Sequence, residues 1–313
     1  MNKISKYDSV FSLDENIRVT LDKQIETKTN KIPSSEQLLN NDSFVVTLQR
    51  NSVRFDYTKK LLNNAGFKNV HAFEAIDGFS SKQGEGDWYK RFNPWSRLFG
   101  TKKKFNGQMG CLASHITIWA WLSMSNAEGL MIFEDDALPR PDFKEILPKY
   151  LNELRQDFKE ECRKYFTAVV DIDLILLGSQ VDASENSYYC NKAGNCTHAY
   201  YITKDGAKKM MKAVEAVSSS GMRKDVSPVD CIISKANRNG LIRAVSLLGK
   251  KIEIDPKYNF NKSTSWDGRD SGIIYQNTDL GSNIHGITTA PCKQSDNNIF
   301  TVNEETGLGE INE

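Results

Sequence analysis

The stretch that decides the fold is Leu130-Met131-Ile132-Phe133-Glu134-Asp135-Asp136. Its four apolar residues predict a buried strand, and they run directly into three acidic residues. Side chains alternate along an extended chain, so Glu134 and Asp136 are expected on one side and Asp135 on the other. Two carboxylates that flank one residue can share a hard cation such as Mg²⁺ or Mn²⁺. A solvated loop or a helix N-terminus would also accept such a cluster, and the pattern alone leaves these interpretations open.

The chain has 313 residues, of which 39% are hydrophobic and 26% are charged. This length and composition allow one large α/β domain or two small ones. The formal net charge of +1 gives no general attraction to nucleic acid, so no nucleic-acid partner is expected. The N-terminal residues hold no apolar segment typical of a signal peptide, and no run of about 18 apolar residues predicts a transmembrane helix. We expect a cytoplasmic protein and leave open a peripheral contact with the inner face of the membrane.

The order of the predicted elements indicates a parallel α/β sheet. A strand, a helix and a second strand are predicted over residues 44–48, 53–62 and 70–75, which is the opening of such a sheet. Further strands are predicted over 173–178, 197–202 and 241–248, and helices over 142–162, 207–217 and from Pro228 onward. Residues 1–41 are predicted to be a polar, poorly packed N-terminal extension, and residues 255–313 a polar C-terminal extension along the surface.

Residues 79–106 are rich in aromatic and basic side chains, including Trp88, Trp95 and the run Lys102-Lys103-Lys104. A long loop inside a compact domain is often functional, and aromatic faces suit sugar rings. The alternative is a loop that packs its own aromatic residues on the domain. The six cysteines are widely spread, and the pair Cys190 and Cys196 lacks the second pair that a zinc site needs.

A helix is predicted from Leu112, with the small residues of Gly107-Gln108-Met109-Gly110-Cys111 directly before it. Ser114 and His115 then fall in its first turns. Small residues let a ligand approach exposed N–H groups, and the helix dipole favours an anion there. A structural histidine is the alternative interpretation of His115.

Short motifs that carry a family resemblance follow one another along residues 43–250. They are Val45-Val46-Thr47-Leu48 with Arg50 and Arg54, Ala75-Ile76-Asp77-Gly78, Gly110-Cys111-Leu112-Ala113-Ser114-His115, Glu134-Asp135-Asp136, Ala199-Tyr200-Tyr201-Ile202 with Gly206-Ala207, and Pro228-Val229-Asp230. In their order and spacing, these motifs make the chain resemble glycosyltransferase family 25. That family includes bacterial lipopolysaccharide galactosyltransferases and collagen galactosyltransferases.

The resemblance implies an α/β fold of the GT-A type, a nucleotide-binding sandwich with a mostly parallel central sheet flanked by helices. Residues 42–254 would form the catalytic domain. The implied activity is metal-dependent transfer of a hexose, most readily galactose, from a UDP-sugar to a hydroxyl of a glycan or glycoprotein acceptor, with inversion. A non-catalytic module that binds a sugar or a nucleotide with the same fold is the alternative.

The resemblance also implies that Glu134-Asp135-Asp136 takes the place of the DxD motif, with Glu134 and Asp136 holding Mn²⁺ or Mg²⁺. His285 is a further candidate metal ligand, because a carboxylate pair leaves coordination sites open. The predicted donor-binding residues are Arg50, Arg54, Asp77, Ser114, His115 and Asp135. Inverting transfer needs a base on the face opposite the leaving group, outside the metal cluster, and Asp230 is the candidate. A carboxylate that interacts with the dipole of its helix is the alternative role for Asp230.

Overall fold

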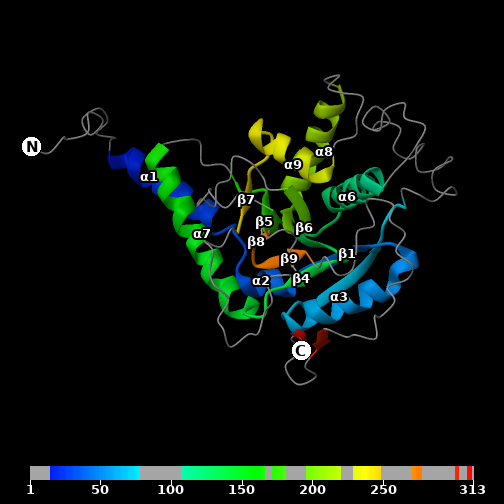
Figure 1. Ribbon diagram of the computed structural model, residues 1–313. Coiled ribbons are helices and arrows are strands. Elements are labelled where there is room, and N and C mark those ends of the chain that lie inside the picture. Colours follow the sequence, from blue (N-terminus) through cyan, green and yellow to red (C-terminus); the bar gives the residue numbers. More distant parts are fainter. Residues whose placement is uncertain are drawn as a thin grey trace, which may run out of the picture.

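The computed structural model describes residues 15–77, 107–165, 171–180, 195–219, 228–247, 270–276, 300–302 and 309–311 (Figure 1). The aromatic and basic loop at 79–106 and the candidate ligand His285 lie outside these ranges. Within the described segments, no helix is long and apolar enough to cross a membrane.

A seven-stranded sheet runs through the molecule in the order β2-β1-β3-β6-β5-β7, with β8 paired to β5. Its strands are β1 (Asp42–Thr47), β2 (Asn69–Glu74), β3 (Gly129–Glu134), β5 (Leu174–Gln180), β6 (Asn195–Thr203), β7 (Ala244–Ser246) and β8 (Asp270–Gly272). The pairs β1–β2, β1–β3 and β5–β7 are parallel, and β6 runs antiparallel to both β3 and β5. Only β6 and β8 are therefore reversed in this sheet, and the predicted, mostly parallel central sheet is confirmed.

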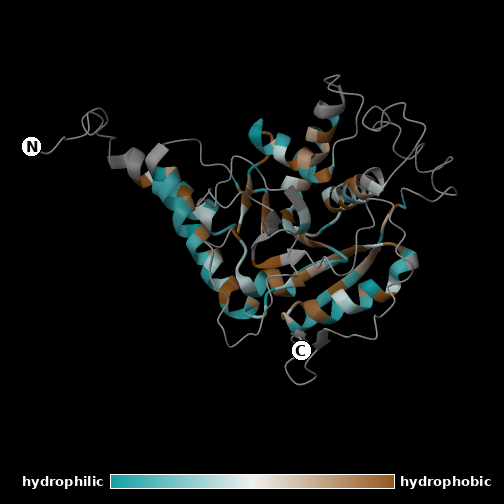
Figure 2. Cartoon of the chain, viewed as in Figure 1, coloured by the Kyte–Doolittle hydropathy of each residue, from teal (hydrophilic) through white to brown (hydrophobic). Residues whose placement is uncertain are grey.

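Helices cover both faces of the sheet (Figure 1). One layer holds α1 (Glu15–Thr29), α2 (Ser35–Asn40), α3 (Ser52–Asn64) and α7 (Phe143–Tyr165), and the other holds α6 (Gly107–Met124), α8 (Lys204–Ser219) and α9 (Val229–Arg238). Along β3, Met131 and Phe133 join the first apolar core, whereas Leu130 and Ile132 join the second. A strand that is buried on both faces needs apolar residues at every position. This requirement explains the uninterrupted apolar run and the brown colour of the central strands in Figure 2.

The N-terminal segment packs better than its composition predicts. Ile25 of α1 and Leu38 of α2 are buried and belong to the same apolar core as β1. Ser34 and Gln37 form a capping box at the start of α2. The expected poor packing is therefore wrong for residues 19–40, because a few apolar residues at the right spacing suffice to pack a helix on the core.

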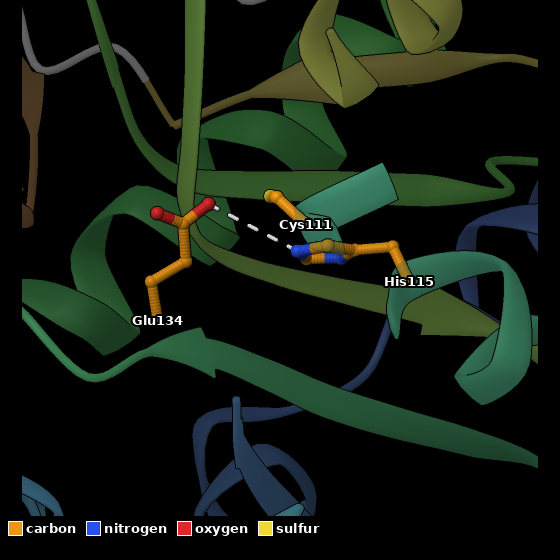
Figure 3. A group of neighbouring side chains, drawn as sticks. All are labelled: Cys111, His115 and Glu134. Atoms are coloured by element: carbon orange, nitrogen blue, oxygen red, sulfur yellow. Dashed lines mark ion pairs between the residues drawn. The ribbon is translucent and has the colours of Figure 1, made fainter. Parts of the chain in front are cut away.

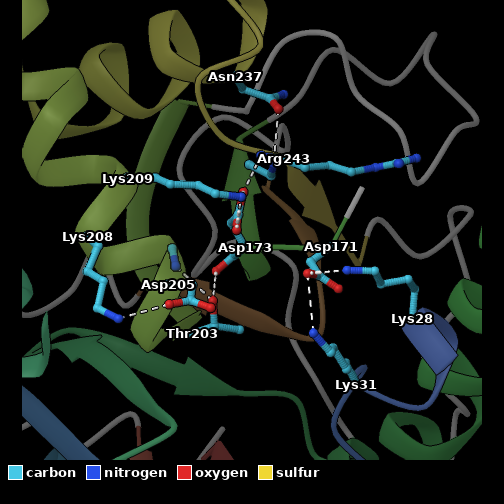
Figure 4. Close-up of polar contacts among 12 residues, drawn as sticks. Lys28, Lys31, Asp171, Asp173, Thr203, Asp205, Lys208, Lys209, Asn237 and Arg243 are labelled. Atoms are coloured by element: carbon cyan, nitrogen blue, oxygen red, sulfur yellow. Dashed lines mark hydrogen bonds and ion pairs between the residues drawn. The ribbon is translucent and has the colours of Figure 1, made fainter. Parts of the chain in front are cut away.

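Polar contacts tie these layers together near the start of β5 (Figure 4). The Asp173 carboxylate accepts hydrogen bonds from Lys209 Nζ of α8 at 2.8 Å and from the Arg243 N–H, next to β7, at 2.9 Å. Two residues earlier, Asp171 pairs with Lys28 Nζ of α1 at 2.7 Å. Both side chains of that pair are half-exposed, so it positions α1 more than it stabilises the fold.

The C-terminal segment returns to the sheet at residues 270–276, contrary to the expected surface extension. There β8 pairs with β5, and β9 (Ile274–Gln276) pairs with β4 (Ala137–Pro139), the short strand that follows the acidic triad. A Cβ on Gly178 would overlap the Ile274 carbonyl oxygen, so the close approach of β9 requires glycine at that position. Sequence analysis did not predict these strands, because residues 270–276 are too few to show the alternation of apolar and polar side chains that is typical of a strand. The last described strands, β10 (Phe300–Val302) and β11 (Gly309–Ile311), form a separate antiparallel pair.

Candidate active site

The acidic triad lies at the carboxyl ends of two neighbouring parallel strands. In the register of β1 and β3, Val46 lies opposite Glu134, so the end of β1 and the triad share one edge of the sheet. The neighbours of β1 are β2 on one side and β3 on the other, so successive connections leave this point in opposite directions. Such a topological switch point is where open α/β sheets bind their ligands.

Both the side chain and the backbone carbonyl of Asp135 are bound by other residues of the protein. Its Oδ2 accepts a hydrogen bond from Thr47 Oγ1 at 2.9 Å, and its Oδ1 lies 2.8 Å from Arg54 Nη2. Thr58 Oγ1 donates to the Asp135 backbone carbonyl at 2.7 Å. Burial raises the pKa of Asp135 to about 6, against the opposing effect of the Arg54 charge. Arg54 and Asp135 were both predicted to bind the donor. They contact each other inside the fold, and their contact with a donor stays a prediction.

Glu134 faces different surroundings from Asp135. Its Oε1 accepts a hydrogen bond from Thr197 Oγ1 of β6 at 2.8 Å. Burial raises the pKa of Glu134 to about 8, and the carboxylates of Asp136, Asp135 and Asp230 push it in the same direction. A cation next to Glu134 would reverse this shift, because it favours the ionised carboxylate.

Asp230 is brought to the same acidic cluster from α9. It is the second residue of that helix, and its Oδ1 accepts a hydrogen bond from the Cys231 N–H at 2.7 Å. Its charge also raises the pKa of Glu134 and of Cys111, so the carboxylate acts on both groups. The sequence predicted Asp230 as a base outside the metal cluster, whereas the fold puts it within electrostatic reach of Glu134.

Cys111 and His115 of α6 face Glu134 (Figure 3). Cys111 Sγ, His115 Nε2 and a Glu134 carboxylate oxygen lie within 4.8 Å of one another, and His115 Nε2 lies 3.9 Å from Glu134 Oε1. Burial, followed by the nearby carboxylates, raises the pKa of the Cys111 thiol. Sequence analysis missed Cys111 as a site residue, although residues four apart on a helix share a face.

The start of α6 differs from the prediction. The helix begins at Gly107, so Ser114 and His115 are its eighth and ninth residues and lie far from the N-terminal dipole. The expected anion site at the helix start therefore does not include them. Two glycines cost only about 1 kcal/mol each in a helix, which the burial of its apolar residues outweighs.

Ser114 organises the chain beside Asp77. Its buried Oγ donates to the Gly110 carbonyl at 2.7 Å and accepts the Ile76 N–H at 2.8 Å. This bond fixes the segment after β2 against α6, and Asp77 is half-buried there. Arg50 lies in the short helix η1 (Gln49–Asn51) after β1, and its side chain is outside the described part. Donor contacts of these three residues stay predictions.

Two sets of ligands could hold a cation at this edge. Glu134 and Asp136 offer the carboxylate oxygens that Mg²⁺ and Mn²⁺ prefer. Cys111, His115 and Glu134 offer sulfur, nitrogen and oxygen atoms, which suit a borderline cation such as Zn²⁺. The chemistry of the first set therefore fits the predicted metal.

Comparison with known proteins identifies the family. Residues 40–233, more than half of the chain, match the family described as glycosyltransferase family 25, LPS biosynthesis protein. The chain belongs to glycosyltransferase family 25. A glycosyltransferase 25 family member of Drosophila melanogaster is 25% identical over 193 residues, which cover 58% of this chain and 29% of the relative. Procollagen galactosyltransferase 1-A of Xenopus laevis is 34% identical over 116 residues, which cover 34% of this chain and 17% of the relative. The match thus spans less than a third of the length of these curated family 25 relatives.

Among solved structures, the galactosyltransferase LgtC in complex with donor and acceptor sugar analogues aligns with a TM-score of 0.35 and 9% identity. The alignment covers 65% of this chain and 72% of that chain. With so low a TM-score, this likeness adds nothing to the fold, which is described by the strand order of the chain itself.

Proposed function

We propose that this chain is a metal-dependent glycosyltransferase. It would move a hexose, with galactose the first candidate, from a UDP-sugar to a hydroxyl of a glycan or glycoprotein acceptor, with inversion. Membership of family 25 supports the reaction class, and the name of the procollagen galactosyltransferase relative supports galactose. The observation that carries the proposal is the gathering of the Glu134, Asp136 and Asp230 charges at the carboxyl edge of the sheet.

Glu134 and Asp136 would hold Mn²⁺ or Mg²⁺. When bound, such a cation stabilises the negative charge that develops on a nucleoside diphosphate leaving group. The raised pKa of Glu134 supports this assignment, because adjacent buried carboxylates repel one another unless a positive charge joins them. Thr197 holds Oε1 of Glu134 by its hydroxyl and so orients the carboxylate.

Asp230 would accept the proton of the attacking acceptor hydroxyl. The bond from the Cys231 N–H to Oδ1 holds one oxygen of the Asp230 carboxylate in place. Because the charge of Asp230 reaches Glu134, the acceptor hydroxyl and the donor phosphates would bind within one small region. The buried ion pair of Arg54 and Asp135 would hold the backbone of the acidic triad in place.

A donor screen tests the proposed function. The full chain is incubated with a panel of UDP-sugars, with Mn²⁺, with Mg²⁺ or with a chelator, and the release of UDP is measured. We expect release from one UDP-hexose with either cation and none with the chelator. UDP binding in calorimetry without turnover on a broad acceptor panel would instead support a non-catalytic binding module.

A further inference from the structure

His115 belongs to a buried hydrogen-bond chain that begins away from the acidic edge. Trp119 Nε1 of α6 donates to the hydroxyl oxygen of Tyr200 in β6 at 3.0 Å, and that hydroxyl lies 2.7 Å from His115 Nδ1. All three side chains are fully buried. His115 Nε2 makes no hydrogen bond to the described residues and is directed at Glu134 (Figure 3).

The hydrogens in this chain can be counted. The His115 ring is fully buried, which disfavours its charged form, and a neutral ring carries one N–H. The Trp119 ring nitrogen can only donate, so it supplies one hydrogen to the Tyr200 oxygen. A single hydrogen lies between Tyr200 and His115 Nδ1, and either the hydroxyl or the ring nitrogen supplies it.

The two assignments have different consequences. If Tyr200 donates to Nδ1, the Tyr200 hydroxyl makes both of its hydrogen bonds, and the donor left without a partner among the described residues is the ring N–H on Nε2, which faces Glu134 Oε1 at 3.9 Å. If Nδ1–H donates instead, the tyrosine hydrogen has no acceptor among the described residues, and the Nε2 lone pair faces a carboxylate. Each assignment leaves one buried donor unpaired within the described residues, but only the Nε2–H lies at the acidic edge, where a substrate oxygen can accept it, and a tyrosine oxygen that accepts a hydrogen bond also donates more strongly.

We propose that Trp119 and Tyr200 are positioning residues that hold His115 as a neutral Nε2–H donor, directed at an oxygen atom of the bound substrate beside Glu134. The recognised group is a hydrogen-bond acceptor, either a phosphate oxygen or a sugar hydroxyl. The substrate part of this inference rests on the proposed function, whereas the position of the proton does not.

The same assignment decides between the two sets of cation ligands. A nitrogen that carries a hydrogen has no lone pair for a metal, so His115 does not complete a site with Cys111 and Glu134. Binding Zn²⁺ through Nε2 would need the other tautomer, in which the Tyr200 hydrogen is unpaired. The cation is therefore left to the carboxylate oxygens of Glu134 and Asp136.

Nitrogen NMR of the full chain labelled with ¹⁵N-histidine tests the proton position directly. There are four histidines, and His115→Gln identifies the signals of His115. In the metal-free protein we expect Nε2 of His115 to show the shift of a protonated ring nitrogen and Nδ1 that of an unprotonated one. Addition of Zn²⁺ alone should leave both shifts in place. A protonated Nδ1, or a shift of Nε2 on addition of Zn²⁺, would overturn the proposal.

Tyr200→Phe removes the hydroxyl with little change in volume, and Tyr201→Phe is the matched control. Tyr201 is the next residue of β6, and its side chain belongs to the core on the opposite face of the sheet. In Tyr200→Phe the two ring nitrogens of His115 should move toward each other as both tautomers become populated, whereas Tyr201→Phe keeps the pattern of the wild type. Circular dichroism checks that both variants fold, and an unchanged His115 pattern in folded Tyr200→Phe would contradict the positioning role.

The activity of the same variants tests the substrate contact. With the UDP-sugar that the donor screen selects, Tyr200→Phe should lower kcat/KM about five- to tenfold, as expected for one weakened hydrogen bond, and Tyr201→Phe less than about twofold. An unchanged kcat/KM in Tyr200→Phe would refute the contact with substrate. If no UDP-sugar is turned over by the wild type, the proposed function fails, while the NMR result still decides the tautomer.

Discussion

Glu134 and Asp135 are neighbours in the sequence but meet opposite surroundings. Asp135 has the Arg54 guanidinium at 2.8 Å and the Thr47 hydroxyl at 2.9 Å. Glu134 receives one hydroxyl, from Thr197, and lies close to three carboxylates that oppose its ionisation. Its pKa accordingly rises to about 8, against about 6 for Asp135. Of these two residues, Glu134 therefore gains more from a bound cation.

The pair of Arg54 and Asp135 gives a prediction about stability. Arg54→Met leaves a buried carboxylate without its counter-charge, and such a change typically costs about 3–5 kcal/mol. The double variant Arg54→Met with Asp135→Asn should lose less than the sum of the two single variants, because neither charge is left alone. Urea unfolding followed by circular dichroism measures all four free energies. Additive losses would show that the two side chains do not interact.

The pKa of Glu134 predicts how stability depends on pH. Folding raises it from 4.5 to about 8, so between these values the native chain keeps a proton that the unfolded chain releases. The free energy of unfolding of the metal-free protein should therefore fall as the pH rises from about 4.5 to 8, by an amount on the order of a few kcal/mol. Bound Mn²⁺ favours the ionised carboxylate and should remove most of this fall.

Glu134→Gln is the control for this pH dependence, because glutamine keeps the shape of the side chain and cannot titrate. The difference in unfolding free energy between wild type and variant, measured by urea titration across the pH range, isolates the contribution of Glu134. A difference that does not vary with pH would contradict the assigned pKa.

At the scale of elements, local patterns predicted what depends on local sequence. The apolar run before Glu134 predicted β3 and its acidic end correctly, and the strand–helix–strand opening predicted β1, α3 and β2. The start of α6 was missed, because glycine is a weak helix breaker when the helix is buried. The return of β9 and the contact of His115 with Tyr200, 85 residues away, depend on tertiary packing that no local period records.

The N-terminal helix α1 offers a test of the revised boundary of the core. Ile25 is 1% exposed, whereas Val19 on the same helix is 48% exposed. Ile25→Ala should lower the free energy of unfolding by about 2–5 kcal/mol, because it leaves a cavity in the shared core, and Val19→Ala should change it by less than about 0.5 kcal/mol. Thermal and urea unfolding compare the two. Equal and small losses of unfolding free energy in the two variants would instead support a loosely attached N-terminal extension.

At the scale of the molecule, the proposed site draws one group from each part of the fold. The triad ends β3, Thr197 comes from β6, His115 from α6 in one helical layer, and Arg54 from α3 in the other. Residues this far apart in the sequence meet only when the whole sheet is assembled. The sequence could therefore predict the acidic triad at the end of a buried strand, but not the different side chains that contact Glu134 and Asp135.

Asp136, together with Glu134, is proposed to hold the cation that family 25 transfer would require in this chain. The most direct test compares the wild type with Asp136→Asn in Mn²⁺-dependent release of UDP from the preferred UDP-sugar. Asparagine keeps the shape of the side chain, and the closer partner of Arg54 is Asp135, so the variant should fold normally by circular dichroism. We predict a loss of turnover of at least about 100-fold. Wild-type turnover in folded Asp136→Asn at the same Mn²⁺ concentration would contradict the account.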